Sequence, residues 1–310
     1  MTSRLRKFSS GILTHPVETI VKSMRYGWTD ASLLLEAGLF KVIRPLLPHL
    51  SAGTQARIKE ALGATVRLDY DRQEIRLHAD SELSIHRARA CAKEPETVEW
   101  IEKFMHEDEV FYDVGANVGA YSLVASKHLM GRIQIEAFEP SFSTYALLCR
   151  NILLNGCQDS IHPHLAALTD RSHLVEFEYR SLEAGAAEHH MTVAKGSRFP
   201  EPRPAYRQSM IGFRIDDLIA DFGFPVPNHM KIDVDGAEID VLRGATRTLG
   251  HDGLRSLLVE VRCQDGQEQD VVNLLKLANF EILSRHDRGD GVVWNYIFVK
   301  KNRSTGKGTR

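Results

Sequence analysis

The stretch from Val110 to Pro140 constrains the fold of this chain more than any other part of its sequence. An apolar strand leads to Asp113, a turn with glycines at positions 115 and 119 follows, and a helical stripe then leads to a second apolar strand that ends at Glu139. This succession of strand, turn, helix and strand is typical of a right-handed βαβ unit. Such units bind nucleotides at the carboxyl ends of their strands. The sequence therefore predicts an α/β fold with a ligand at this edge.

Changes of periodicity divide the 310 residues into four parts. Residues 1–63 have apolar side chains at helical spacing and predict a helical amino-terminal extension, and residues 64–94 predict a β-hairpin and a connector. Residues 95–299 have the strand and helix patterns of one α/β domain, in which Ile161 to Leu168 is predicted to form a single strand. An insertion at 172–212 contains an apparent strand but is otherwise expected to be a lid or a disordered loop. Residues 300–310 predict a basic, disordered tail.

Composition excludes several functional classes. The net charge is -2, and no apolar run approaches the roughly 18 residues that a membrane-spanning helix needs. We therefore expect no transmembrane segment and no nucleic-acid partner. The four cysteines lack the close spacing of zinc or redox sites, which favours reduced thiols in a cytoplasmic protein. The basic amino-terminal helices leave open a peripheral contact with an anionic membrane surface or a homodimer contact.

The residues around the predicted turn indicate a nucleoside as the ligand. Gly115 gives the backbone room to turn, and Gly119 permits close packing where the helix begins. Amides at this helix start favour an anionic or polar group. Glu139, at the end of the adjacent strand, could accept both hydroxyls of a ribose. The structural alternative is that the glycines only build a tight turn and that Glu139 caps a helix.

Two cofactor classes compete for such a site. A dinucleotide-binding turn normally has glycine where this chain has Asn117, and Asp113 would repel a diphosphate. S-adenosylmethionine fits better, because it has no phosphate and carries an ammonium and a sulfonium. An NAD(P)-dependent Rossmann oxidoreductase is the alternative enzyme. A non-catalytic cofactor-binding scaffold protein is the alternative from a different class.

Several ordered motifs resemble the FkbM family of S-adenosylmethionine-dependent methyltransferases. They lie between about residues 95 and 299, at Asp113–Ser122, Phe138–Pro140, Ala166–Asp170, Ile215–Ile219, Lys231–Glu238, Leu242–Ala245 and Leu258–Val261. The resemblance implies a class I methyltransferase sheet, Rossmann-like, of order 3-2-1-4-5-7-6 with the last strand antiparallel. It also implies O-methylation of a small-molecule or glycan hydroxyl. The cofactor-binding residues expected at these motifs are Asp113, Gly115, Ala116, Asn117, Gly119, Glu139, Pro140 and Ala167.

The catalytic residues are less constrained, because methyl transfer from sulfur to oxygen is an in-line displacement that needs no protein nucleophile. A general base would help a hydroxyl acceptor to react. Asp233 is the first candidate, since it ends the strand predicted beside the cofactor strand. His190, with its neighbour His189 in the insertion, is the second.

Other charged residues allow further interpretations. No metal site is predicted, although Asp233, Asp235 and Glu260 could together bind Mg²⁺. Asp235 departs from the family pattern, which commonly has glutamate there. These carboxylates could instead cap a helix or pair with Lys231 and Arg262. An anionic acceptor could be bound by arginines of the insertion and the segment after it, which are Arg203, Arg207 and Arg214.

Overall fold

The computed structural model describes residues 41–186, 204–263, 266–289 and 291–301 and the backbone of 190–192. The chain divides into two units after Gly63. The described part of the first unit contains the short helix η1 (Leu47–His49) and α3 (Ala52–Ala61). Ser51 begins α3, because its side chain accepts a hydrogen bond from the Thr54 amide. The predicted helices before residue 41 and most of the predicted tail lie outside the described residues.

The second unit begins with the predicted hairpin. Strands β1 (Thr65–Arg67) and β2 (Arg76–His78) are antiparallel, with Val66 opposite Leu77. Leu68, Ile75 and Leu77 are fully buried in the larger core, so the hairpin is anchored by its apolar side chains. Three short helices form the connector: α4 (Glu82–His86), η2 (Arg87–Arg89) and α5 (Ala90–Lys93).

A sheet of seven strands forms the centre of the second unit. In spatial order the strands are β12 (Phe280–Asp287), β13 (Val293–Lys300), β11 (Ser256–Arg262), β10 (His229–Ile232), β3 (Val110–Val114), β4 (Gln134–Phe138) and β5 (Ile161–His164). β13 is antiparallel to both of its neighbours, and the other pairs are parallel. Numbered along the chain, this order is 3-2-1-4-5-7-6 from the β5 edge. The predicted α/β class with a mostly parallel sheet is confirmed.

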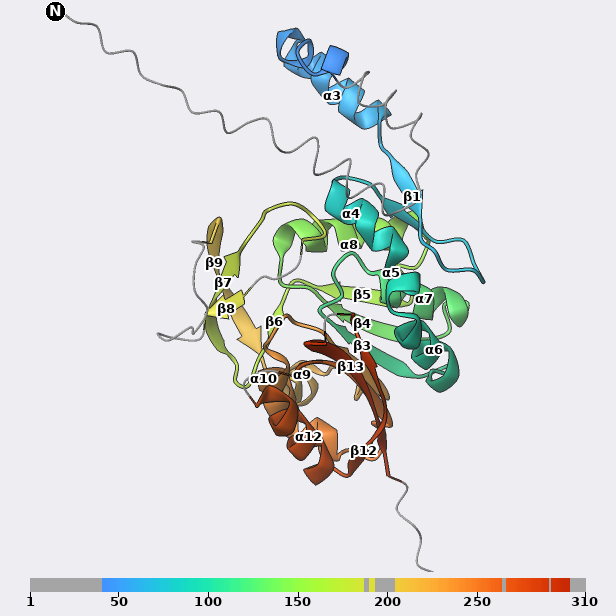
Figure 1. Ribbon diagram of the computed structural model, residues 1–310, viewed down its shortest axis with the longest axis vertical. Coiled ribbons are helices and arrows are strands. Elements are labelled where there is room, and N and C mark those ends of the chain that lie inside the picture. The colour runs from blue at the N-terminus through green and yellow to red at the C-terminus, as the bar shows by residue number, and fades with distance from the viewer. Residues whose placement is uncertain (1–40, 187–189, 193–203, 264–265, 290, 302–310) are drawn as a thin grey trace, which may run out of the picture. The chain divides into compact units, whose positions relative to one another are not determined.

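Helices cover both faces of this sheet (Figure 1). Neighbouring residues of β3 point to opposite faces, as the period of a strand requires: Phe111 belongs to one apolar cluster and Tyr112 to the other. The first cluster includes side chains from α6 (Pro95–Phe104), α7 (Ala120–His128) and α8 (Phe142–Leu154). The second includes side chains from α9 (Ile215–Phe222), α10 (Glu238–Gly244), α11 (Thr246–Gly250) and α12 (Gln267–Leu277). Two cores therefore hold the parallel strands buried on both sides.

A smaller sheet corrects one prediction. The predicted strand from Ile161 to Leu168 is two strands: β5 stays in the main sheet, and β6 (Ala167–Leu168) pairs with β9 instead. The chain leaves the main sheet because β4 ends at Phe138, opposite His164, and offers no partner beyond it. The remaining strands of the smaller sheet, in the order β6-β9-β7-β8, are β7 (His173–Tyr179), β8 (His190–Thr192) and β9 (Tyr206–Phe213).

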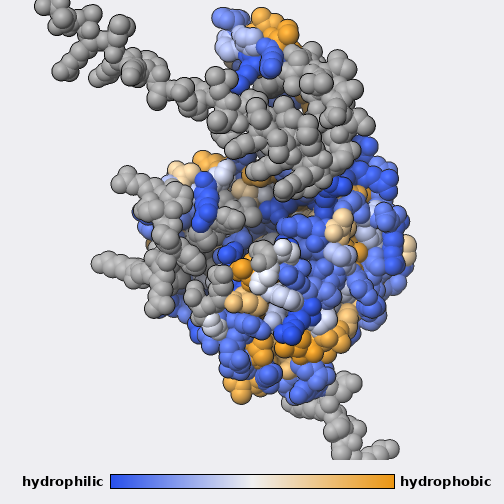
Figure 2. Space-filling view, in the orientation of Figure 1, coloured by the Kyte–Doolittle hydropathy of each residue, from blue (hydrophilic) through white to orange (hydrophobic). Residues whose placement is uncertain are grey.

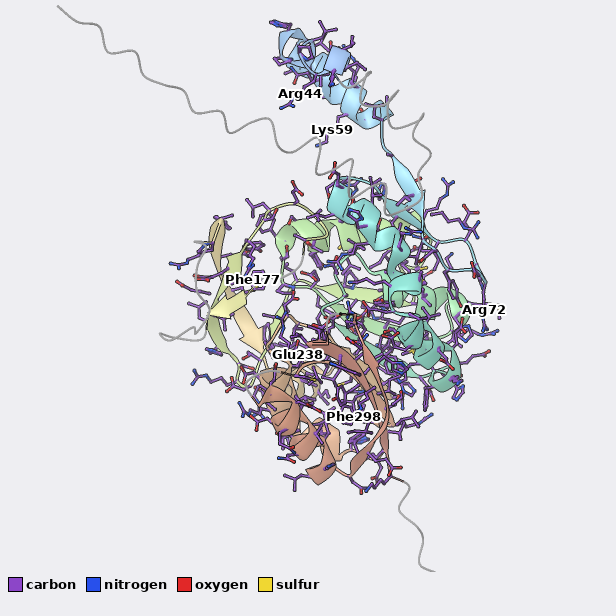
Figure 3. All side chains as sticks on the ribbon, in the orientation of Figure 1. Arg44, Lys59, Arg72, Phe177, Glu238 and Phe298 are labelled. Carbon is purple, nitrogen blue, oxygen red and sulfur yellow. The ribbon has the colours of Figure 1, made fainter. Side chains whose placement is uncertain are left out.

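Within the predicted insertion, the expected strand from Leu174 to Tyr179 is part of β7, and β8 and β9 are two further strands. β7 and β9 pair over seven register positions, from His173 with Gly212 to Tyr179 with Tyr206. Their inward side chains, together with Ala167 of β6, form a separate apolar cluster to which Phe177 belongs. Figure 3 labels Phe177 in this smaller sheet, apart from Phe298 of the main sheet. Residues 187–189 and 193–203 lie outside the described residues.

Some apolar side chains stay exposed at the β12 end of the main sheet. Leu277 at the end of α12 is 90% exposed and Leu283 of β12 is 53% exposed. Apolar surface gathers at that end of the molecule in Figure 2. Among the described residues, no helix combines the length and apolarity needed to cross a bilayer.

Candidate active site

Two glycines shape the turn between β3 and α7 as the sequence predicts. Gly115 has a φ of +82°, and a Cβ atom there would lie 1.9 Å from the carbonyl oxygen of Asp233. The turn therefore packs directly on the chain that follows β10. Gly119 has a φ of +86° at the start of α7, where a Cβ atom would lie 2.5 Å from Leu148 of α8. A side chain at Gly115 would push these elements apart, because the clash is with backbone, whereas one at Gly119 would require the Leu148 side chain to move.

The backbone amides of this turn, from residue 115 to residue 119, are all bonded within the protein. Residues 115–119 each donate to a protein oxygen at 2.8 to 3.0 Å. The acceptors are Phe138 O for Gly115 and Ala116, Glu139 Oε2 for Asn117, Asn117 Oδ1 for Val118 and Ala116 O for Gly119. The turn consequently offers no free amide to a phosphate group.

Glu139 lies at the carboxyl end of β4 with only 6% of its surface exposed. Its Oε2 accepts from the Asn117 amide at 2.9 Å and its Oε1 from the Ser141 amide at 2.8 Å. Burial raises the pKa of Glu139 to about 7, although both amides oppose the rise. Each carboxylate oxygen can accept a second hydrogen bond. Glu139 therefore holds the turn through Asn117, which no sequence pattern predicted, and keeps the capacity to accept two hydroxyls.

Asp113 is buried at the end of β3 with one oxygen unsatisfied. Its Oδ2 accepts a 2.6 Å hydrogen bond from Ser122 of α7, but its Oδ1 is buried and has no partner. Burial raises the pKa of Asp113, while Lys231 and Ser122 lower it. A buried acceptor without a donor is costly, so a ligand donor or a water would be stabilised there. Ser122 is part of the quoted motif, but the sequence alone gave it no role.

Lys231 and Asp233 form an ion pair at the end of β10. Lys231 Nζ donates to Asp233 Oδ2 at 2.8 Å and lies 5.2 Å from the ring centre of Tyr121. The Lys231 side chain is 2% exposed and that of Asp233 24% exposed, so Asp233 can still meet a ligand. Burial raises the pKa of Asp233, but Lys231 and Arg288 outweigh it and hold the pKa below its usual value. Asp233 is therefore a weak proton acceptor, which disfavours the predicted role as general base.

Glu260 occupies the corresponding position on the next strand, because Ile232 and Val259, the residues before Asp233 and Glu260, are register partners. Arg288, from the segment after β12, bridges Glu260 at 2.8 Å and Glu94 at 2.7 Å. Burial and repulsion by Asp233 raise the pKa of Glu260, while Arg288 lowers it. The two neighbouring carboxylates thus have pKa values that their surroundings shift in opposite directions.

The alternative of a magnesium site is not supported by the described residues. No three metal-binding side chains converge among them. Of the carboxylates considered, Asp233 and Glu260 have the basic partners given above, and Asp235 lies 4.0 Å from Arg262. Arg262 and Lys231 were the partners that the structural alternative predicted. Glu238, the first residue of α10, accepts hydrogen bonds from the amides of Val234 and Gly236 in the turn after β10. Figure 3 labels Glu238.

The other predicted site residues are placed as follows. Ala167 packs in the cluster of the smaller sheet, and Pro140 follows Glu139 before α8. The backbone of His190 pairs with Glu178 in the smaller sheet, and its side chain, like His189 and Arg203, lies outside the described residues. Arg207 pairs with Glu178 at 2.9 Å and Arg214 with Asp216 at 3.2 Å.

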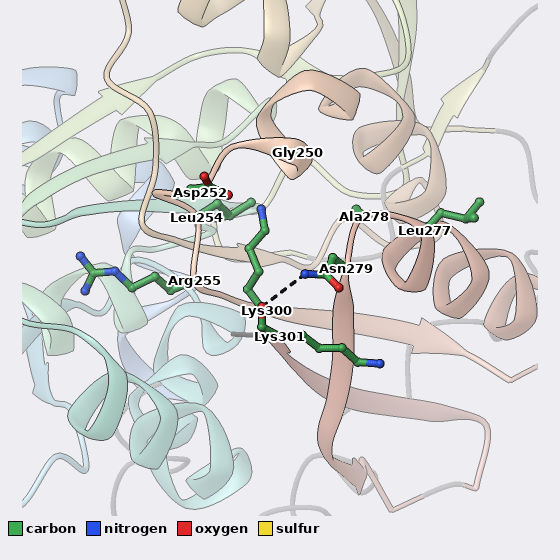
Figure 4. A pocket seen from close by; sticks show the side chains of 9 residues that line it. All are labelled: Gly250, Asp252, Leu254, Arg255, Leu277, Ala278, Asn279, Lys300 and Lys301. Carbon is green, nitrogen blue, oxygen red and sulfur yellow. Dashed lines mark hydrogen bonds between the residues drawn. The ribbon is translucent and has the colours of Figure 1, made fainter. Parts of the chain in front are cut away.

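A pocket of about 510 Å³ lies at the opposite end of the sheet (Figure 4). It is lined by residues before β11, around the start of β12 and at the end of β13, among them Arg255, Asn279 and Lys300. The carboxylates described above lie at the other ends of the parallel strands. We therefore place the candidate active site at the turn and the carboxylates, not in this pocket.

A family model described as the methyltransferase FkbM domain matches residues 113–282, which begins at Asp113 and includes the turn, Glu139, Asp233 and Glu260. The chain belongs to the FkbM methyltransferase family. The structure thus shows how an FkbM domain arranges its motifs at one edge of the sheet, and the chain is a methyltransferase.

Three relatives are similar to this chain over most of their own length. The hexuronic acid methyltransferase AglP of Haloferax volcanii is 26% identical over 63% of this chain and 72% of the relative. The 31-O-demethyl-FK506 methyltransferase FkbM of Streptomyces tacrolimicus is 25% identical over 58% and 75%. Methyltransferase 1 of Beauveria bassiana is 30% identical over 63% and 82%.

Proposed function

We propose that this FkbM methyltransferase uses S-adenosylmethionine to methylate a hydroxyl oxygen of a small molecule or glycan. The observation that carries the proposal is the use of the turn amides: the amide of Asn117 donates to Glu139, and no amide from 115 to 119 is left for a diphosphate. An NAD(P) cofactor would need such donors. A nucleoside without phosphates needs only the carboxylate at the end of β4, which Glu139 supplies.

The orphaned oxygen of Asp113 fits the same cofactor. An ammonium group beside Asp113 Oδ1 would satisfy this buried acceptor, directly or through a water, and Glu139 would accept the ribose hydroxyls. The cofactor, when bound, supplies an electrophilic methyl group on a sulfonium. The residues of the chain hold the acceptor oxygen in line and exclude water.

The two carboxylates at the ends of β10 and β11 suggest a division of roles. Asp233, whose pKa is lowered by Lys231 and Arg288 against the effect of burial, stays ionised and suits an electrostatic or binding role. Glu260, whose pKa is raised to about 9 by burial and by Asp233, holds its proton at neutral pH and cannot take one from the acceptor hydroxyl. We therefore assign the removal of the acceptor proton to neither carboxylate.

A hydroxylated acceptor is also favoured by the relatives. AglP is named for a hexuronic acid and FkbM for an O-demethyl compound, so both names describe oxygen-rich acceptors. Arg207 and Arg214 already pair with Glu178 and Asp216, which makes them poor candidates for binding an anionic acceptor.

The experiment that tests this function is transfer of a labelled methyl group from S-adenosylmethionine to a panel of neutral sugars, uronic acids and cell extracts. We expect label in an acceptor as a base-stable methyl ether, whereas reaction at a carboxylate oxygen would give a base-labile methyl ester. The proposal of hydroxyl methylation is contradicted if the label is lost in mild base. The proposed catalytic activity is contradicted if the protein binds the cofactor but labels no acceptor.

A further inference from the structure

The segment Ala184–Ala186 lies against the cofactor turn and is held there by five hydrogen bonds with four residues of different elements. Asn117 Nδ2 of the turn donates to Ala186 O at 3.1 Å, and the Ser81 hydroxyl donates to Ala184 O at 2.9 Å. The Gly185 amide donates to Thr144 of α8 at 3.3 Å, and the fourth contact comes from Arg87 of η2. The connector before the methyltransferase domain and the start of the predicted insertion are thus joined at the rim of the site.

Arg87 uses one edge of its guanidinium in this contact. Its Nε and one terminal nitrogen both donate to Gly185 O, at 3.1 and 3.0 Å. Gly185 O is a neutral acceptor, and among the described residues Arg87 forms no ion pair. The guanidinium has five donors in a planar fork, so its other edge can still bind a carboxylate. A cation with a free edge is thereby fixed beside the turn.

The charge of Arg87 reaches both ends of the site. Burial raises the pKa of Glu139, and Arg87 is one of the groups that lower it. Arg87 likewise lowers the pKa of Asp233, after Lys231 and Arg288. Arg87 therefore lies close enough to interact with the carboxylate beside the turn and with the carboxylate at the end of β10.

The other cations of the site are already bound by carboxylates. Lys231 donates to Asp233 beneath the surface, and Arg288 bridges Glu94 and Glu260. Lys93 is the other cation that could bind a ligand carboxylate, because its Nζ lies 3.9 Å from Glu94 and 56% of its side chain is exposed. The cofactor in the proposed function has one carboxylate, on its amino-acid portion, which a cation with unused donors would stabilise most.

We propose that Arg87 binds the carboxylate of the amino-acid portion of S-adenosylmethionine, with its fork oriented by Gly185. This assignment rests on the proposed function. It gives the connector at 64–94 a direct role in cofactor binding, and it makes Ala184–Ala186 the segment that sets the position of the guanidinium.

The test compares two ligands by calorimetric titration: S-adenosylmethionine and its decarboxylated form, which lacks only the carboxylate. A charge-assisted Arg–carboxylate contact is worth roughly a ten- to hundredfold change in affinity. We expect Arg87→Gln to weaken S-adenosylmethionine by that factor and the decarboxylated form by less than about threefold. Wild-type protein should prefer S-adenosylmethionine, and the variant should lose this preference.

Three variants separate direct binding from a structural role. Ser81→Ala removes another contact to Ala184–Ala186 without changing charge, so it should weaken both ligands equally. Arg89→Gln removes the same charge from the same short helix and should keep the preference. Lys93→Gln tests the rival cation and should also keep it.

Each outcome is decisive. Equal weakening of both ligands by Arg87→Gln, with the preference intact, would show a structural role and overturn the proposal, as would loss of the preference in Lys93→Gln instead. If wild-type protein binds S-adenosylmethionine without preferring it to the decarboxylated form, the carboxylate contact is absent and only this inference fails. If wild-type protein binds neither ligand, the proposed function fails as well.

Discussion

The backbone at Gly115 lies so close to Asp233 that a Cβ atom there would come within 1.9 Å of the Asp233 carbonyl oxygen. This contact joins the turn after β3 to the chain after β10, which carry the cofactor and catalytic candidates respectively. We expect Gly115→Ala to separate them and to abolish measurable binding of S-adenosylhomocysteine, because the clash is with backbone and a positive φ adds about 1–2 kcal/mol of strain.

The matched control is Gly131→Ala. Gly131 also has a positive φ, of +75°, but a Cβ atom there would meet nothing within 4 Å. This variant should lose only about 1–2 kcal/mol of unfolding free energy and bind the ligand normally. Equal ligand affinities for the two variants in calorimetry would refute the close contact.

Glu139 should make cofactor binding depend on pH. Its pKa is raised to about 7 by burial, and the ionised form is the better acceptor for ribose hydroxyls. Affinity for S-adenosylhomocysteine should therefore be constant above about pH 7.5 and fall up to tenfold per pH unit below pH 7. Calorimetric titrations from pH 5.5 to 8.5 test this. Glu139→Gln should bind weakly with no such dependence, and an unchanged pH profile in that variant would exclude Glu139 as its source.

The raised pKa of Glu139 predicts that the stability of the fold changes with pH in the opposite direction to the affinity for the cofactor. A carboxyl group whose pKa is raised in the folded state contributes stability below its unfolded pKa of about 4.5, and this contribution is lost as the pH rises toward 7. The free energy of unfolding of Glu139→Gln relative to wild type should therefore increase between pH 4.5 and 7. Denaturant titrations at several pH values would show this trend, and a constant difference would contradict it.

Replacing only one partner of the ion pair between Lys231 and Asp233 should lower the free energy of unfolding. Lys231→Met leaves a carboxylate without its buried cation, which costs about 3–5 kcal/mol for fully buried pairs. We expect about 3 kcal/mol, because the Asp233 side chain is 24% exposed. The double variant with Asp233→Asn should recover part of this loss. Urea denaturation of wild type, Lys231→Met, Asp233→Asn and the double variant measures the coupling energy between the two side chains. Additive losses of stability would mean that the two side chains do not interact.

A second buried hydrogen-bond network, which lies far from the candidate active site, should make the stability of the fold depend on pH. His229 lies between Ser256 Oγ, 2.7 Å from its Nδ1, and Glu109 Oε2, 2.9 Å from its Nε2. Because the Glu109 carboxylate can only accept, the neutral ring donates from Nε2 to Glu109 and accepts at Nδ1 from the Ser256 hydroxyl, whose oxygen accepts from Trp100 at 2.9 Å. Burial lowers the pKa of His229, although Glu109 raises it.

Because this pKa is lowered, the unfolded chain binds a proton that the folded chain resists. Stability should therefore fall as the pH drops through about 6.5, the unfolded value. His229→Gln should be less stable at pH 7.5 and should lose part of this dependence. Melting temperatures of wild type and His229→Gln from pH 5.5 to 7.5 test this prediction. Parallel curves for the two proteins would assign the pH dependence of stability to other groups.

Local sequence patterns predicted the parts of the fold that depend on local rules. The period of β3, the glycines at 115 and 119 and the carboxylate at 139 lie within thirty residues, and their backbone roles follow from strand geometry and steric limits. The split between β5 and β6 could not be predicted, because it depends on where β4 ends and on β9, more than forty residues later.

The charges of the site depended on contacts that are remote in sequence. Arg288 bridges Glu94 and Glu260, and no spacing in the sequence indicates that contact. The weak basicity of Asp233 follows from Lys231, two residues away, but also from Arg288. The position of Arg87 depends on Gly185, almost one hundred residues later. Sequence patterns therefore indicated which carboxylates gather at this edge but not which of them stays ionised.

The measurement that tests the central claim most directly is a calorimetric titration of the full chain with S-adenosylmethionine, S-adenosylhomocysteine and NAD. The arrangement of the turn amides, Glu139 and Asp113 predicts saturable binding of the first two with one site per chain, and no binding of NAD. Binding of NAD without binding of either S-adenosyl compound would contradict it.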